Sequence, residues 1–281
     1  MNDTNRTADT GHGDGARAAI ASAARNNAEW CAAVCRSHGI PYETGEAAWW
    51  SVRRTPAYYP DAVTLRPDAV AEDILRRVDT SAGCSVKDSF ATLDLTAHGF
   101  TPLLHGTWFH RPADPPGNPS GAPAGPRTVP GSRTTADVVR DAGRLAAWVS
   151  AWHGGSGTGS GAEGDSGRHI PAAPDVFRPT LLRDPAVRVL TVHRDGAPVG
   201  GAVLNLGAGL VGVTNVFTLG APGTPSVWSA VVRAAADHFP GVPLVGYATE
   251  SGPDAEADAG EPLPPGFRPL GALRVWLRTG A

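Results

Sequence analysis

The sequence predicts an α/β fold built on a mixed sheet, and three features of its last hundred residues support this prediction. Residues 187–193 alternate apolar and polar side chains as a half-buried strand does, and the Asp195-Gly196 pair that follows suits a type I′ hairpin turn. Residues 198–206 and 210–219 read as further strands joined at 207–209. A Gly/Pro loop at 220–225 then leads into an amphipathic helix over 226–239, a buried strand over 242–248 and a final strand at 273–278.

The size and charge of the chain restrict the classes of function that remain. Its 281 residues suggest about two structural units, with roughly 150 residues in each. A net charge of −3 and the absence of a basic patch argue against a nucleic-acid partner. No stretch approaches the ~18 apolar residues of a membrane span, and the first 25 residues lack the apolar core of a signal peptide. We therefore expect a cytoplasmic protein without a membrane partner, present as a monomer or homodimer.

The cysteines and the single lysine of the chain do not indicate a function. The three cysteines, an odd number, are typical of a reducing compartment rather than of a disulfide framework. Lys87 is the only lysine, and the preference for arginine reads as coding bias without functional meaning.

The first part of the chain predicts a small unit over residues 26–111. Residues 1–25 have the composition of a disordered tail. Asn26 and Glu29 form a plausible capping box for a helix that ends at Gly39. A second helix is expected over 67–79 and strands over 86–95 and 102–111.

Two breaks in composition separate this unit from the rest. Residues 112–133 are rich in Pro and Gly and predict a linker. Residues 153–168 form a flexible Gly/Ser insert within a second unit over 134–281. Between these breaks, residues 134–152 predict an amphipathic helix.

A short sequence repeat relates the two units. Residues 99–111 align with 266–278 without a gap, and Gly, Phe, Pro, Leu and the terminal Arg coincide. Chance is the alternative, because Gly-Phe-x-Pro is a common entry from a turn into a strand. We interpret the repeat as an internal duplication in which the first unit is degenerate.

The order of hairpin, long strand, glycine loop, helix, buried strand and closing Gly266-Phe267 element resembles the GNAT superfamily of N-acetyltransferases. The resemblance covers residues 187–278 and, through the repeat, implies a tandem architecture of two GNAT-like units. It implies a co-substrate, acetyl-CoA or another acyl-CoA, bound along the strand 210–219. Backbone groups on this strand would pair with the pantetheine arm of the co-substrate: Val213, Asn215 and Val216.

The resemblance also implies a pyrophosphate site on the following loop and helix start, where unpaired N–H groups attract anions. The residues in this place are Gly220, Gly223, Thr224 and Ser226. The loop departs from the pattern Gln/Arg-x-x-Gly-x-Gly/Ala of the family, because it reads Gly220-Ala-Pro-Gly-Thr-Pro225. A well-formed helix start is the alternative interpretation, since Pro is favoured in the first turn.

The catalytic groups are less clearly marked. The tyrosine that GNAT enzymes often place shortly before Gly-Phe is missing between residues 251 and 265, and the nearest substitutes are Tyr247 and Glu250. Glu250 would act as a base through a water molecule. Alternatively, Tyr247 belongs to the core and Glu250 caps the next helix.

Other clusters have structural alternatives of the same kind. Tyr58 and Tyr59, with Trp49 and Trp50, either line an acceptor pocket or hold the first core together. His169 and His193 lack an evident carboxylate partner. The Cys31–Cys35–His38 spacing lacks a fourth ligand, so we expect no metal.

These observations predict an acyl-CoA-dependent N-acyltransferase that acts on a small-molecule amine. The alternative is a catalytically inactive GNAT-fold module that binds a ligand or another protein, because the co-substrate loop is altered.

Overall fold

A computed structural model describes residues 10–114, 134–154, 156–157, 175–220, 224–249 and 263–280. The helices are α1 (Thr10–His38), α2 (Ala71–Leu75), α3 (Ala142–Gly154) and α4 (Thr224–His238), with two short 3₁₀ turns, η1 (Thr96–His98) and η2 (Pro179–Arg183). The strands of the first part are β1 (Tyr42–Thr44), β2 (Ala48–Ser51), β3 (Ala62–Thr64), β4 (Ser85–Asp88) and β5 (Phe100–Arg111). The remaining strands are β6 (Thr134–Val138), β7 (Ser156–Gly157), β8 (Val187–Arg194), β9 (Ala197–Gly207), β10 (Leu210–Thr218), β11 (Leu244–Thr249) and β12 (Arg268–Arg278).

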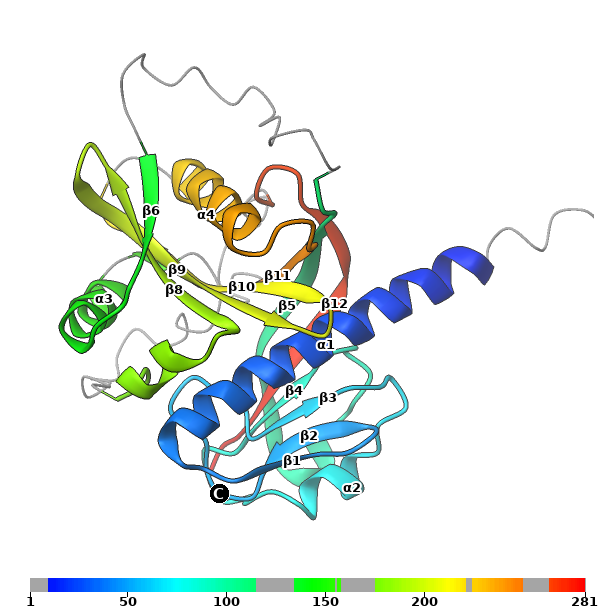
Figure 1. The fold of residues 1–281 in the computed structure, drawn as a ribbon. Helices are drawn as coiled ribbons and strands as arrows, with labels where there is room; N and C mark the ends of the chain where they lie inside the picture. Colours follow the sequence, from blue (N-terminus) through cyan, green and yellow to red (C-terminus); the bar gives the residue numbers. More distant parts are fainter. Residues whose placement is uncertain are drawn as a thin grey trace, which may run out of the picture.

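The strands form one continuous mixed sheet (Figure 1). Its order is β1-β2-β3-β4-β12-β5-β11-β10-β9-β8-β6, and β7 pairs with β10 beside this path. The pairs are antiparallel except for β3 with β4 and β10 with β11, which are parallel. The order is therefore symmetric about its centre, since each half contains a parallel pair followed outward by antiparallel strands.

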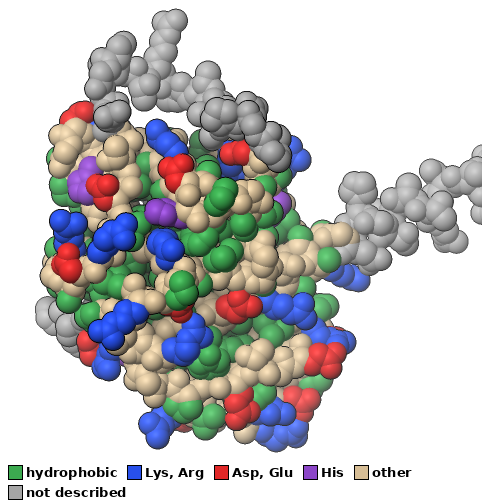
Figure 2. All heavy atoms as spheres, in the orientation of Figure 1, with side chains coloured by type: hydrophobic (Ala, Val, Ile, Leu, Met, Phe, Trp, Pro, Cys, Tyr) green, Lys and Arg blue, Asp and Glu red, His purple; other side chains and the backbone are tan. Residues whose placement is uncertain are grey.

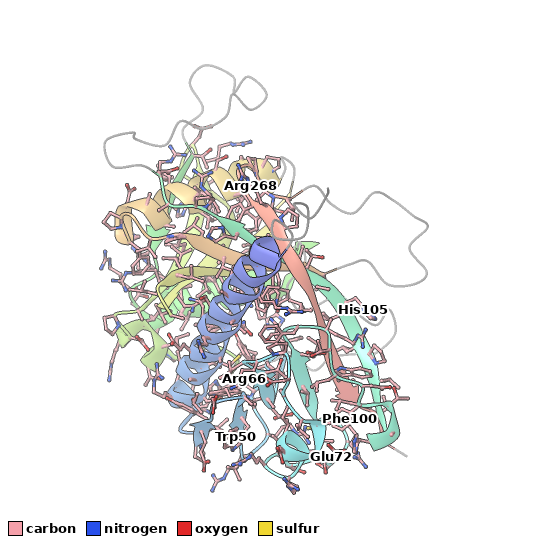
Figure 3. All side chains as sticks on the ribbon, turned by 90° about the vertical axis from the view of Figure 1, so that its right-hand side faces the viewer. Trp50, Arg66, Glu72, Phe100, His105 and Arg268 are labelled. Carbon is pink, nitrogen blue, oxygen red and sulfur yellow. The ribbon has the colours of Figure 1, made fainter. Side chains whose placement is uncertain are left out.

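The two copies of the sequence repeat lie next to each other at this centre. They form β5 and β12, which pair antiparallel along almost their whole length, from Arg268 opposite His110 to Arg278 opposite Phe100. Figure 3 shows the two strands side by side, with Arg268 and Phe100 at opposite ends of the pair. Each copy opens on a glycine with a positive φ, 78° at Gly99 and 82° at Gly266. The glycines of the repeat thus mark the turn that directs each chain segment into the central pair.

In the central pair, each half of the sheet contains a strand from the other part of the sequence. β12, from the end of the chain, pairs with β4 of the first part, and β5 pairs with β11 of the last part. Each half is completed by a strand from the other, so the division at residues 26–111 and 134–281 stays a prediction from sequence.

Helices cover both faces of the sheet. On β10, Val213 packs with α4, whereas Phe217, which follows a shift in the register of the strand, packs with α1 and α3. The helix α1 therefore crosses one face, in contact with β9, β10 and β12, while α4 covers the other (Figure 1).

The first helix begins at Thr10 rather than at Asn26, and only residues 1–9 of the predicted tail lie outside the described part of the chain. Residues 16–24 contain six alanines, which have the highest helix propensity, and Ala23 and Ala24 are fully buried. Residues 15–18 are exposed, so packing on the sheet stabilises the helix from about residue 19 onward.

Asn26 has a different role from the predicted cap. Its Nδ2 lies 3.2, 3.0 and 3.1 Å from the carbonyl oxygens of Asn205, Gly207 and Leu210, at the turn between β9 and β10. In return, the Asn205 amide donates to the Asn26 backbone and side-chain oxygens, both at 3.2 Å. This reciprocal amide contact fixes α1 against the β9–β10 hairpin.

Three other predicted segments differ from the structure. Residues 134–138 form the edge strand β6 and not the start of a helix, because Thr134 and Thr135 favour extended backbone and pair with β8. β4 ends at Asp88 because its carboxylate accepts the backbone N–H groups of Phe90 and Leu93, which turns the chain away from the sheet. The predicted helix over 67–79 is shortened to α2, since Val70 keeps an extended backbone.

The hairpin predictions are confirmed. Asp195 and Gly196 have φ values of 51° and 84°, as a type I′ turn requires. Ala208 and Gly209 repeat this pattern with 49° and 74° between β9 and β10.

On the face shown in Figure 2, basic and acidic side chains are interspersed around apolar patches. Within the described residues, no helix is long and apolar enough to cross a membrane.

Replacing Asn26 by Ala should lower the free energy of unfolding by about 2–4 kcal/mol, because three buried or part-buried carbonyl groups lose this donor and the Asn205 amide loses one of its two acceptors. Urea denaturation measures the change. Ser22→Ala is the matched control on the same helix, since the Ser22 hydroxyl bonds only to the exposed Ala18 carbonyl oxygen. Equal stability of the two variants would contradict the structural role of Asn26.

Candidate functional site

The site begins where β10 and β11 separate. The two strands pair only at Val211 with Leu244 and at Gly212 with Val245. Beyond these pairs β10 stays with β9 as far as Thr218, and β11 stays with β5 as far as Thr249. The parallel strands therefore part towards their carboxyl ends, which is where α/β sheets commonly bind ligands.

A bulge in β10 accompanies this parting. The register with β9 shifts between Thr214 and Phe217, and Asn215 within the shift has a φ of 51°. Asn is one of the few residues that tolerate this left-handed backbone conformation. The bulge changes the direction in which the side chains point. Val213 and Val216 pack towards α4, while Thr214 and Asn215 lie at the cavity on the opposite side.

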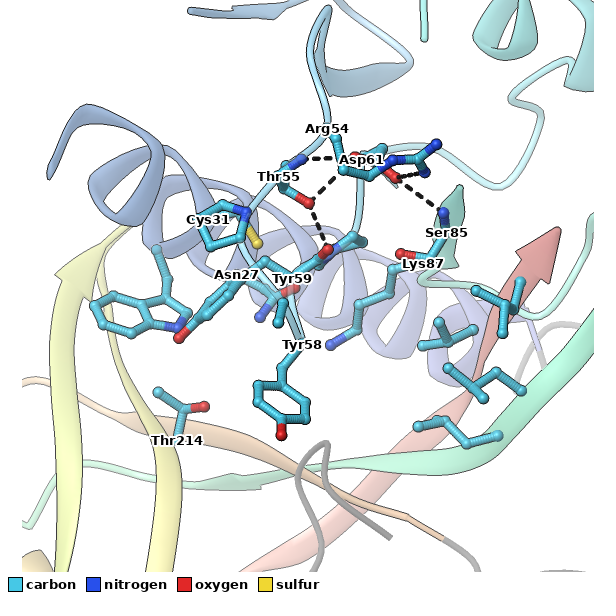
Figure 4. Close-up of a pocket in the computed structure, with 18 of the residues that line it drawn as sticks. Asn27, Cys31, Arg54, Thr55, Tyr58, Tyr59, Asp61, Ser85, Lys87 and Thr214 are labelled. Carbon is cyan, nitrogen blue, oxygen red and sulfur yellow. Dashed lines mark hydrogen bonds and ion pairs between the residues drawn. The ribbon is translucent and has the colours of Figure 1, made fainter. Parts of the chain in front are cut away.

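A cavity of about 470 Å³ opens on the α1 side of the parted strands (Figure 4). Asn215 from β10 and Tyr247 from β11 line it, together with Asn27, Trp30 and Cys31 from α1. Its other walls come from the loop 54–61, from β4, and from the central strands β5 and β12. Elements of both halves of the sheet thus surround one space of the size of a small-molecule site.

Lys87 on β4 lies at this cavity, and its side chain points inward in Figure 4. The residue is only 2% exposed, and its Nζ lies 3.4 Å from the centre of the Tyr247 ring and 4.5 Å from that of Trp108. No described residue forms a hydrogen bond with this nitrogen. Burial lowers the pKa of Lys87 to about 7, although the neighbouring Cys31 opposes the shift.

Sequence reasoning missed Lys87, although a signal was available. The chain has 24 basic Lys and Arg residues, and one of them is lysine, so 23 are arginine. A guanidinium stays charged in proteins, whereas a buried amine can lose its proton. Coding bias alone does not account for the one lysine lying at this cavity.

A buried carboxylate shapes the loop over the cavity. Asp61 accepts hydrogen bonds from Arg54 at 2.8 Å and from the backbone N–H groups of Thr55 at 2.9 Å and Ser85 at 3.0 Å. Tyr58, within this loop, has a φ of 72°, which is unfavourable for a bulky side chain. Strained residues held by their surroundings are enriched at functional sites.

Two phenols, Tyr59 and Tyr247, and the Cys31 thiol are held neutral at this cavity. Burial raises the pKa of Tyr59 and of Tyr247 well above that of a free phenol. Burial also raises the pKa of Cys31 to about 12, so its thiol is a poor nucleophile near neutral pH.

The predicted co-substrate residues fall into two places. Val213, Asn215 and Val216 lie on β10 at the parting and the bulge, where they were expected. Gly220, with a φ of 65°, follows β10, and Thr224 and Ser226 lie in the first turn of α4. Gly223 lies outside the described residues.

The predicted catalytic residues are Tyr247, which lines the cavity, and Glu250, which lies outside the described residues. Of the predicted aromatic cluster, Tyr58 and Tyr59 line the cavity, whereas Trp49 and Trp50 pack in two separate cores.

The other predicted clusters do not assemble a site. Among the residues that the structure describes, no three His, Cys, Asp or Glu side chains are placed to hold a metal ion. His38 bonds instead to the Val176 carbonyl oxygen at 3.0 Å. His193 does have a carboxylate neighbour, since its Nδ1 lies 3.1 Å from Asp137, and His169 lies in a part of the chain that is not described.

Comparison with solved structures supports the fold. A GCN5-related N-acetyltransferase from Kribbella flavida superimposes with a TM-score of 0.55 at 17% sequence identity, over 92% of this chain and 96% of that protein. A second protein of that name, from Sphaerobacter thermophilus, has a TM-score of 0.47 at 13% identity over 84% of this chain and 78% of that protein. No protein-family model and no curated protein matches the sequence. The predicted GNAT-like α/β fold is confirmed.

The buried amine predicts an unusual dependence of stability on pH. The folded protein releases the Lys87 proton at about pH 7, whereas an unfolded lysine holds it to about 10.5. The unfolded state then binds more protons between these values, so the free energy of unfolding should rise with pH, by about 1.4 kcal/mol per pH unit.

The measurement is urea denaturation of the wild type and of Lys87→Met between pH 6 and 9.5. The difference between the two proteins isolates the lysine contribution. Parallel curves would show that Lys87 is not buried as described.

Proposed function

We propose that the protein is an acyl-CoA-dependent N-acyltransferase that transfers an acetyl or related acyl group to a small amine. The observation that carries this proposal is that the cavity lies where β10 and β11 separate. Asn215 and Tyr247, one on each parted strand, both line the space that an acceptor would occupy. A thioester held between the strands would face an amine that approaches from the α1 side.

The co-substrate arm has a plausible place on β10. Beyond Gly212 this strand has lost β11 as a neighbour, and β7 pairs with it only at Phe217 and Thr218. Its edge from Val213 to Val216 therefore suits an extended, amide-bearing arm. The start of α4 follows directly and offers backbone N–H groups near the positive end of the helix dipole. Pro225 lacks one of these groups, so the anion site would use fewer amides than a regular helix start.

Acyl transfer requires a proton to leave the amine and another to reach the departing thiolate. The phenol of Tyr247 stays protonated at neutral pH because burial raises its pKa, which suits a hydrogen-bond donor to the thiolate. Glu250, the next residue after β11, stays our candidate for the base.

Calorimetric titration tests the proposal directly. Acetyl-CoA and desulfo-CoA should both bind, and acetyl-CoA with an amine should release CoA and give an N-acetyl product detected by mass spectrometry. Absence of binding at millimolar co-substrate would overturn the proposal. Binding without any product across a set of primary amines would favour a ligand-binding module.

Substitutions of Asn215 in the β10 bulge test whether acetyl-CoA binds at the separated strands. Asn215→Val should weaken acetyl-CoA binding at least tenfold, because a β-branched residue disfavours the positive φ and straightens the strand. Asn215→Gly is the matched control, since glycine adopts this conformation freely and should retain most of the affinity. Unchanged binding by the valine variant would place the co-substrate elsewhere.

A further inference from the structure

The cavity contains buried polar atoms that the protein itself leaves unpaired. Lys87 Nζ and Asn27 Oδ1 border it without a hydrogen bond to a described residue. The Trp30 indole can only donate to Tyr59 Oη, so the phenol O–H has no acceptor among the described residues. Lys87 is 2% exposed and Tyr59 is 8% exposed, so water does not readily replace the missing partners. Leaving such groups unpaired is unfavourable, and a ligand that supplies their partners is bound more tightly.

The carboxylates nearest in sequence and structure do not serve as the counter-ion of Lys87. Asp61, in the loop over the cavity, is committed to Arg54 and two backbone N–H groups. Asp88, next to Lys87 in β4, accepts the backbone N–H groups of Phe90 and Leu93. Among the described residues Lys87 forms no ion pair, so an anionic ligand group is the complementary partner.

The unpaired atoms differ in their hydrogen-bonding character. A lysine ammonium and a phenol O–H donate, whereas the Asn27 amide oxygen accepts. A carboxylate accepts from both donors, and an amine on the same molecule can donate to Asn27. Charge-assisted hydrogen bonds of this kind are stronger than neutral ones.

Apolar side chains make up much of the remaining lining, beside the polar groups of Thr55, Ser85, Thr214 and Asn215. Trp30 and Tyr58 supply aromatic surface on one side, and Leu103, Leu104 and Val275 supply aliphatic surface on another. This lining favours an apolar side chain of moderate size rather than a second charged group.

We infer that the acceptor is an amine that also carries a carboxylate and an apolar side chain, as an apolar amino acid does. Its carboxylate pairs with Lys87 and Tyr59, and its amine lies towards Asn27 and the parted strands. Lys87 is then a specificity-determining residue. This inference rests on the proposed N-acyl transfer, but the ligand site it describes can be measured without that reaction.

Matched acceptors test the inference. L-Phenylalanine and 2-phenylethylamine differ only by the carboxylate, and the wild type should prefer the amino acid by about 10- to 100-fold in kcat/KM. Lys87→Met should reduce this preference ratio at least tenfold, and Tyr59→Phe should reduce it less. Lys87→Arg should retain part of the preference, and Arg178→Met, an exposed arginine away from the cavity, should leave the ratio unchanged.

Ligand binding in the absence of acyl-CoA tests the proposed carboxylate site separately from the proposed acyl transfer. L-Phenylalanine should raise the Tm of the wild type more than 2-phenylethylamine does, and this difference should be lost in Lys87→Met. If that pattern holds but acetyl-CoA is never consumed, the ligand site stands and the proposed acyl transfer fails.

The opposite results overturn the inference. A wild type that acetylates both acceptors equally would be an acyltransferase without a carboxylate site. Equal losses for both acceptors in Lys87→Met, with an unchanged ratio, would assign Lys87 to proton transfer or to the core instead.

Discussion

The antiparallel pairing of β5 with β12 joins the two halves of the sheet, and the positions of all elements around the cavity depend on it. β12 also pairs with β4, which carries Lys87, and β5 also pairs with β11, which carries Tyr247. The pairing therefore brings an amine from the first half to 3.4 Å from an aromatic ring of the second. The site belongs to neither half alone.

The two halves contribute different chemistry. The last part of the chain supplies the bulged strand, the parting from β11 and the helix start, which are the features suited to an acyl-CoA. The first part supplies Lys87, Tyr59 and the loop ordered by Asp61. In the function that we propose, the first unit would recognise the acceptor, because recognition needs side chains rather than a nucleotide-binding loop.

Turn residues and hydrophobic periodicity in the sequence predicted the elements whose conformation depends mainly on neighbouring residues. The Asp195-Gly196 turn, the strand order from β8 to β11 and the helix α4 followed from turn chemistry and periodicity. Elements fixed by distant partners were not predictable in this way: Thr134 and Thr135 become a strand by pairing with β8, and Asn26 is held by the β9–β10 turn. The role of Lys87 was missed for the same reason, since its neighbours come from strands far apart in sequence. Val213, Asn215 and Val216 lie on a strand that the local pattern predicted, and their co-substrate role stays a prediction.

The exchange of strands has a consequence for synthesis on the ribosome. β4 and β5 are close in sequence but are separated in the sheet by β12, which is translated about 150 residues later. Until then the emerging first half has a gap in its sheet, bordered by two strands with unpaired backbone groups. Such edges invite pairing with other chains. The nascent protein therefore exposes these edges until its last strand is synthesised.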